Sequence, residues 1–99
     1  MGNSAIDFPW LPTHVTTTAL VKTGAGVLHS IVLNGLTTVG DITVYDGINA
    51  GGTVLAILHL ATATSISVQP MTLEYDAEVT TGIYLAYGTA VADLTVMYK

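Results

Sequence analysis

The sequence predicts an all-β protein: an antiparallel β-sandwich of the jelly-roll or Greek-key type, with seven or eight short strands and an extended N-terminal arm. Three observations predict this class. Apolar and polar residues alternate with a period of two, Gly-rich turns separate the alternating runs, and β-branched residues are frequent where no helical period occurs. The length of 99 residues fits one sandwich. We expect the arm over residues 1–15 and the sandwich domain over 16–99.

The alternation is clearest in MTLEYDAEV at 71–79, where apolar residues hold the odd positions and polar residues the even ones. Runs of the same kind predict strands near 15–22, 26–34, 41–46, 53–60, 71–79, 83–87 and 93–98, and a short strand at 64–68 would make eight. The runs VLHSIVLN and TVLAILHL are apolar on both faces, so we expect them to be central strands. NGLTTVGD at 34–41 and DGINAGG at 46–52 are expected turns, because Asn-Gly and Asp-Gly favour positive φ.

Composition excludes several classes of function. Only 9% of the residues are charged, and 2 Lys+Arg against 7 Asp+Glu give a net charge of −5. Two cations neutralise few phosphates, so we expect neither nucleic-acid binding nor attachment to an anionic membrane. The longest apolar run, VLAIL, is far shorter than the roughly 18 residues that a bilayer span needs. The absence of Cys excludes disulfides and thiolate metal sites.

The ionisable residues do not form a recognisable site. His14, His29 and His59 lack the spacing of a metal site, so we expect core or strand-pairing histidines and no metal. His29 and His59 could face each other across a sheet, and their protonation would then loosen the fold. Glu74, Asp76 and Glu78 share one strand face, which is either solvated or in contact with a basic partner.

The sequence also lacks catalytic signatures. It contains no Gly-x-Ser-x-Gly, no phosphate-binding Gly-Lys-Ser/Thr loop and no Cys nucleophile. Ser30 follows His29, but strand alternation would place the two side chains on opposite faces, so they are not expected to form a dyad. We therefore expect no enzyme, no catalytic residue and no cofactor.

The segment SAIDFPWLP at 4–12 contains the only Phe, the only Trp and two of the three Pro residues. Two interpretations stay open: the segment folds back over its own core, or it is an arm that reaches another subunit or a partner. Two prolines favour an extended chain, and nine extended residues span roughly 30 Å. The expected partner-binding residues are Ile6, Phe8, Pro9, Trp10, Leu11 and Pro12.

Five segments carry a resemblance to a known group of proteins. KTGAGVLHSIVLNG, GDITVYDG, GGTVLAIL, LEYDAEVTTGIYLAYGT and ADLTVMYK together resemble small virion proteins of tailed bacteriophages, described as head decoration, cement or head-fibre proteins. The similarity covers most of residues 20–99 and consists of a strand-and-turn pattern. It implies a non-enzymatic β-sandwich, often oligomeric, fixed on the outside of a phage head.

The resemblance thus implies a capsid decoration protein that binds the major capsid protein, forms a homo-oligomer, with a trimer favoured, and stabilises the head. Such a chain would be made in the cytoplasm of the bacterial host and end on the outer capsid surface. The alternative is a head- or tail-fibre module that recognises a bacterial surface glycan. In that case Tyr45, Tyr84 and Tyr87 would offer exposed rings for stacking on sugars.

Overall fold

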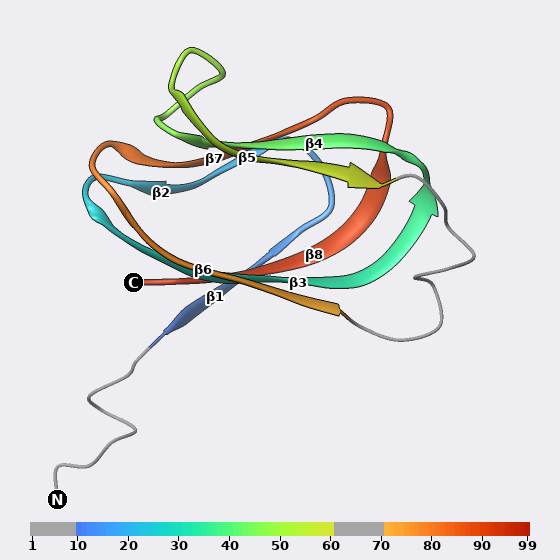
Figure 1. The fold of residues 1–99 in the computed structure, drawn as a ribbon, viewed down its shortest axis with the longest axis horizontal. Helices are drawn as coiled ribbons and strands as arrows, with labels where there is room; N and C mark the ends of the chain where they lie inside the picture. The colour runs from blue at the N-terminus through green and yellow to red at the C-terminus, as the bar shows by residue number, and fades with distance from the viewer. Residues whose placement is uncertain (1–9, 61–70) are drawn as a thin grey trace, which may run out of the picture.

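The chain forms two antiparallel β-sheets packed face to face, as a computed structural model shows for residues 10–60 and 71–99 (Figure 1). The strands are β1 (Leu11–Val15), β2 (Ala19–Thr23), β3 (Gly26–Thr38), β4 (Gly40–Asp46), β5 (Thr53–Leu60), β6 (Met71–Val79), β7 (Gly82–Tyr87) and β8 (Val91–Tyr98). In these two stretches no helix is long and apolar enough to cross a bilayer. The predicted all-β sandwich is confirmed.

The order of the strands is that of a jelly roll. Sheet A has the order β1-β8-β3-β6, and sheet B has the order β2-β7-β4-β5. The pairs β1–β8, β2–β7, β3–β6 and β4–β5 are those of one long hairpin ribbon, which folds over so that β3 also pairs with β8 and β4 with β7. In Figure 1, sheet B forms the upper layer and sheet A the lower layer.

The core lies between the two sheets. Each strand directs alternate side chains inward, and the largest fully buried ones come from both sheets. They are Leu28, Ile31, Val79, Leu94 and Val96 from sheet A, with Ile42, Val44, Ile83 and Leu85 from sheet B. Because this layer is apolar throughout, it is the main source of stability.

Several sequence predictions agree with the structure in detail. The strands at 53–60 and 71–79 have the predicted bounds, and β6 alternates between exposed acids and inward apolar residues as expected. The predicted strand at 64–68 lies outside the described residues.

The N-terminal boundary differs from the prediction. A single strand was expected at 15–22, but β1 and β2 occupy this region, in different sheets, with Thr16–Thr18 between them. Residues 11–15, expected to belong to the arm, pair with β8 as an edge strand of sheet A. The sandwich therefore begins before residue 16. The sequence does not reveal that the chain passes from sheet A to sheet B at Thr16–Thr18, because the alternating run on each side of these residues is too short.

Strand β3 is longer than predicted. The segment from Asn34 to Thr38 was expected to turn, but it continues β3 and pairs with β8. The register of this pairing shifts at Leu33/Gly35 and again at Leu36/Thr38. Such irregularities bend a strand and increase its twist, so Gly35 lies at a bend within β3 and not in a hairpin turn.

Strand β5 does not lie where its sequence predicts. Its run TVLAILHL was expected at the centre of a sheet, as VLHSIVLN was. The structure confirms a central position for β3, between β8 and β6, but places β5 at the edge of sheet B. Among the strands of residues 10–60 and 71–99, this apolar sequence therefore has one neighbour, β4.

A carboxylate fixes the turn between β6 and β7 to the end of β4. Asp46 accepts hydrogen bonds from the backbone N–H groups of Thr80, Thr81 and Gly82, at 2.9–3.3 Å, and from the Thr80 hydroxyl at 3.2 Å. These donors, the Thr80 and Thr81 amides first, hold the pKa of Asp46 below its ordinary value of 3.8. The turn joins the two sheets, so this contact also connects them.

Replacement of a fully buried core residue should be costly. Leu94 on β8 is completely inaccessible, so Leu94→Ala leaves a cavity and should lower the free energy of unfolding by about 2–5 kcal/mol. Urea denaturation followed by circular dichroism measures the change. Leu11→Ala on exposed β1 is the control and should change stability by less than about 0.5 kcal/mol. Equal losses in both variants would contradict the assigned core.

Removal of the Asp46 charge should change how the melting temperature depends on pH in the acid range. Because the folded pKa lies below the unfolded one, the ionised carboxylate stabilises the fold above the unfolded value of 3.8, and this contribution is lost as pH falls through the folded pKa. Asp46→Asn should therefore melt at a lower temperature than the wild type at pH 7 and show a flatter decline below about pH 4. Thermal melts over this pH range test it, with Glu78→Gln as the matched control. Parallel curves for Asp46→Asn and the wild type would refute the role of Asp46.

Candidate functional site

Three of the six expected partner-binding residues lie in the described part of the chain. Trp10 precedes β1 and is half-buried, while Leu11 and Pro12 are exposed on β1 itself. Ile6, Phe8 and Pro9 lie outside the described residues. Trp10, Leu11 and Pro12 form an apolar corner at the edge of sheet A, where Leu11 is opposite Tyr98. We call these three residues the apolar corner.

Trp10 packs on its own protomer. Its ring stacks on the imidazole of His29, with 4.3 Å between the ring centroids and 26° between the planes. The Lys99 ammonium lies 5.8 Å from the centroid of the Trp10 ring, within the range of a cation–π contact. Trp10, the first described residue after the N-terminal segment, is therefore held against the outer face of sheet A.

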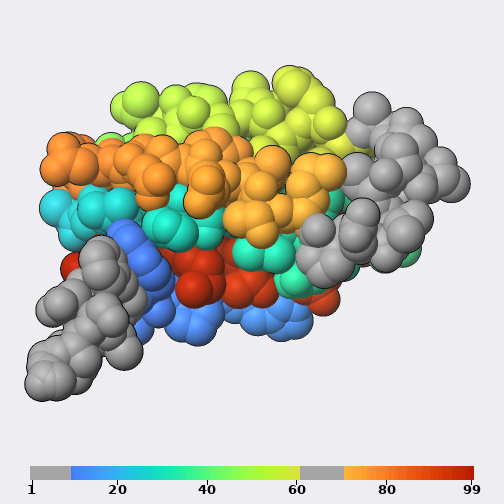
Figure 2. All heavy atoms as spheres, turned by 60° about the horizontal axis from the view of Figure 1, so that its bottom comes forward, coloured from blue at the N-terminus to red at the C-terminus, as the bar shows by residue number. Residues whose placement is uncertain are grey.

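Trp10 packs on β3 where the register of that strand is irregular on both sides. Against β8, Leu28 pairs with Tyr98 and Ser30 with Met97, so His29 is an extra residue that bulges from β3. Against β6, Leu28 pairs with Ala77 and Ser30 with Glu74, so His29 is opposite two residues of β6. One of these two, Asp76, has a φ of 48°, a left-handed conformation that is uncommon outside glycine. Its carboxylate is 3.6 Å from Nε2 of His29. The irregular register thus turns His29 outward beneath Trp10 (Figure 2 shows β6, β3, β8 and β1 as successive bands).

The bulge also overturns the prediction for Ser30. Strand alternation predicts that Ser30 and His29 point to opposite faces, but Nδ1 of His29 lies 3.0 Å from the Ser30 hydroxyl oxygen. The contact is not a catalytic dyad in this form, because the Ser30 side chain is buried, at 3% exposure, and Trp10 covers the imidazole. The hydroxyl instead satisfies and orients His29.

The other two histidines are also on outer faces. Of the two expected alternatives, core or strand-pairing histidines, His14 and His59 therefore fit the second, because both are in paired strands. His14 lies 2.6 Å from the Asp93 carboxylate, and Asn34 donates to both Asp93 and Thr95. The Asn34 hydrogen bond and then the His14 contact lower the pKa of Asp93. This cluster connects β1, β8 and β3 across the outer face of sheet A.

His29 and His59 do not meet, because they lie in different sheets. His59 on β5 is exposed and contacts Asp41 of β4 at 3.0 Å. Each histidine of the chain is thus beside one aspartate, but within residues 10–60 and 71–99 no group of three or more potential ligands could hold a metal ion.

The outer face of sheet B differs from that of sheet A because it carries a row of apolar side chains, in addition to the exposed His59–Asp41 pair. One row of cross-strand neighbours runs over all four strands, from Leu20 through Tyr84 and Tyr45 to Val54. We call these four residues the apolar row. The two tyrosine rings are 6.1 Å apart, and Leu20 and Val54 are about half exposed. By contrast, the corresponding outer face of sheet A carries Glu74, Asp76, Glu78 and Asp93.

Tyr87 was expected beside Tyr45 and Tyr84, but the structure places it inward. Its hydroxyl donates to the carbonyl oxygens of Val15 and Ala92, and its ring packs against the core. Burial, with a smaller contribution from Asp93, raises its pKa to about 12. Tyr87 therefore connects the two sheets and offers no face to a ligand.

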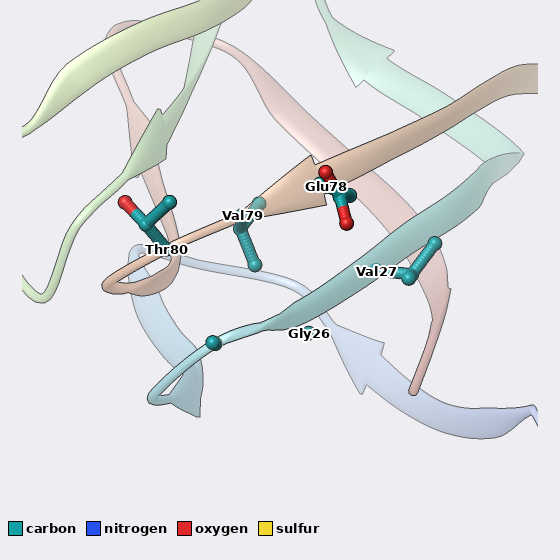
Figure 3. Close-up of a pocket in the computed structure, with 6 residues that line it drawn as sticks. Gly26, Val27, Glu78, Val79 and Thr80 are labelled. Atoms are coloured by element: carbon teal, nitrogen blue, oxygen red, sulfur yellow. The ribbon is translucent and has the colours of Figure 1, made fainter.

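A hollow of about 390 Å³ lies between the start of β3 and the end of β6 (Figure 3). Gly26, Val27, Glu78, Val79 and Thr80 line it, with Ala25. It offers a single carboxylate and no second ionisable group among its lining residues, which is too little to orient a reactive ligand.

Sequence reasoning singled out the residues of the apolar corner, and it named Tyr45 and Tyr84 as exposed rings, but it did not find the apolar row. Leu20, Tyr45, Val54 and Tyr84 are far apart in the sequence, and only the sheet order makes them neighbours. For Val54, the available signal was the apolar character of TVLAILHL on both faces. Comparison with known proteins adds nothing to this assignment, since no family model, curated protein or solved structure matches the chain.

The Trp10–His29 stack can be followed directly, because Trp10 is the only tryptophan. His29→Ala removes the stacking partner, so the Trp10 emission should shift to longer wavelength and acrylamide quenching should increase. The loss of stability should be about 0.5–1.5 kcal/mol, the usual range for an aromatic pair. His59→Ala in sheet B is the matched control and should leave the emission unchanged. An unchanged spectrum in His29→Ala would show that the stack does not form.

Proposed function

We propose that this protein is a structural virion protein: a decoration protein that binds the major capsid protein on the outside of a phage head and stabilises the shell. The observation that carries the proposal is the contrast between its two outer faces. Sheet A is polar and acidic, and sheet B is crossed by the apolar row. A protein held on a surface needs one face for the surface and another for water.

The apolar corner supports the same proposal. Trp10 is held by His29 and Lys99, and Leu11 is 53% exposed beside it. Because Trp10 is fixed in place, the residues before it lose less conformational entropy when they bind. Ile6, Phe8 and Pro9 would then extend the apolar contact onto a neighbouring capsid subunit. Many copies on one shell would bind together, so that the N-terminal segment of each copy need contribute only a small part of the binding free energy.

A second candidate function rests on the tyrosine pair. Tyr45 and Tyr84 lie side by side on the outer face of sheet B, where their rings could stack on the faces of sugar rings. This arrangement favours a fibre module that recognises a bacterial surface glycan. The glycan-binding hypothesis depends on Tyr45 and Tyr84 alone, because the Tyr87 ring packs against the core and its hydroxyl bonds to Val15 and Ala92.

Removal of residues 2–9 tests the decoration hypothesis. The deletion keeps Trp10 and β1, which belong to the sandwich, so the melting transition should persist. Binding to heads assembled from the major capsid protein of the same phage should fall by more than about tenfold, as the loss of the two apolar anchors Ile6 and Phe8 implies. Co-sedimentation with heads that lack the protein measures the occupancy.

A glycan-array or whole-cell binding assay, combined with the co-sedimentation assay, distinguishes the two candidate functions. Tyr45→Ala with Tyr84→Ala should abolish glycan-array or whole-cell binding if the protein is a fibre module. Full head occupancy by the deletion variant, together with glycan binding that requires the tyrosines, would reject the decoration hypothesis in favour of the fibre module.

A further inference from the structure

Strand β5 is an edge strand with the sequence of a central strand. It has eight residues, runs TVLAILHL, and contains no Pro and no carboxylate. It pairs with β4 on one side and ends the order of sheet B on the other. Edge strands present unpaired N–H and C=O groups, which is why proteins usually guard them with charge, proline, bulges or short length.

The other three edges of the two sheets have such protection. Strand β1 is only five residues long and contains Pro12, which cannot donate to a ladder. Strand β2 is equally short and has an irregular register at Leu20/Lys22. Strand β6 carries three carboxylates, and Asp76 interrupts its regular backbone. Among the strands that the structure describes, β5 alone is an edge of eight residues without Pro, Lys, Arg or a carboxylate, although its register against β4 also shifts once, at Leu55.

We propose that β5 pairs edge to edge with β5 of a second copy of this chain. The two strands run antiparallel about a two-fold axis, and the two B sheets join into one sheet of eight strands. The contact is isologous, so it closes at two copies. It is therefore distinct from the trimer that the resemblance implies, and it does not depend on what the protein binds.

Charge leaves β5 as the edge at which two copies of the chain can meet. Each chain carries a net charge of −5, so copies repel each other unless the contact avoids their acids. Contact through β6 or through the outer face of sheet A would bring Glu74, Asp76 and Glu78 of both copies together. Strand β5 has no carboxylate. The two carboxylates opposite it on β4 already have partners, since Asp41 contacts His59 and Asp46 accepts hydrogen bonds from the turn between β6 and β7. The β5 edge is thus the approach with the least repulsion.

The outward side chains fix the register. In an antiparallel pair, opposite residues share a face, so a symmetric pairing places one residue opposite its own copy. Ile57 lies near the middle of β5, faces outward and is 46% exposed. With Ile57 opposite Ile57 of the second copy, the two exposed isoleucines meet on the outer face, and Ala56 lies opposite Leu58, so that inward residues also meet inward residues. A junction of this kind buries a small area, so we expect a weak dimer in the micromolar range.

Sedimentation velocity of the full chain without capsids, over a series of concentrations, tests the proposal. The wild type should shift from monomer to dimer, and Ile57→Lys should weaken dimerisation by more than about tenfold, because it places two like charges opposite each other. Thr72→Lys, an equal charge change on the exposed β6 edge, is the matched control and should not weaken it. Val54→Lys replaces Ile57→Lys if the latter lowers the melting temperature.

Hydrogen exchange locates the contact. In the dimer, the β5 amides that do not bond to β4 should become protected as concentration rises, while those of β2 at the opposite edge should not. A monomer at every concentration, a trimer that Ile57→Lys leaves intact, or protection confined to another edge would overturn the proposal. So would a chain that stays monomeric alone but binds a strand of another protein through β5.

Discussion

The rest of the structure depends on the burial of apolar side chains between two sheets. Each strand has one face for that interior, and nine large side chains of this layer are fully inaccessible to solvent. With the core supplied by alternate residues, the other face of each sheet is free of the packing constraint. The two outer faces can therefore differ in chemistry without loss of the fold.

The two outer faces use that freedom in opposite ways. Sheet A carries acids, a His–Asp–Asn cluster and the stacked Trp10, whereas sheet B carries the apolar row. On sheet A, His14, Asp93 and Asn34 are hydrogen-bonded to one another, and the carboxylates of Glu74 and Glu78 are exposed, which suits a face in water. The apolar row has no such partners, and its exposed area gains free energy only when something covers it. This difference links the fold to a role at an interface.

Local departures from regular pairing create the distinctive features. The bulge at His29 turns an imidazole outward, places Ser30 beside it and gives Trp10 a surface on which to stack. Asp46 similarly compensates for a turn whose amides have no strand partner. In both cases a side chain provides a hydrogen-bond partner for a backbone or ring group that has no partner in the strand ladder. The corner that holds the N-terminal segment is thus a consequence of irregular register.

The sequence by itself determined the fold class, most strand positions and the outward acids of β6, because period-two alternation is a local property that burial imposes on every strand. It also drew attention to Trp10, Leu11 and Pro12, since bulky apolar residues beside prolines are visible without a structure. The tertiary structure alone decided the strand order, which made β5 an edge, brought Leu20, Tyr45, Val54 and Tyr84 into one row and turned Tyr87 inward. Those relations join residues that are distant in the chain, and no local pattern encodes which strand will lie beside which. The bulge at His29 was equally hidden, because it depends on the register between β3 and its two neighbours.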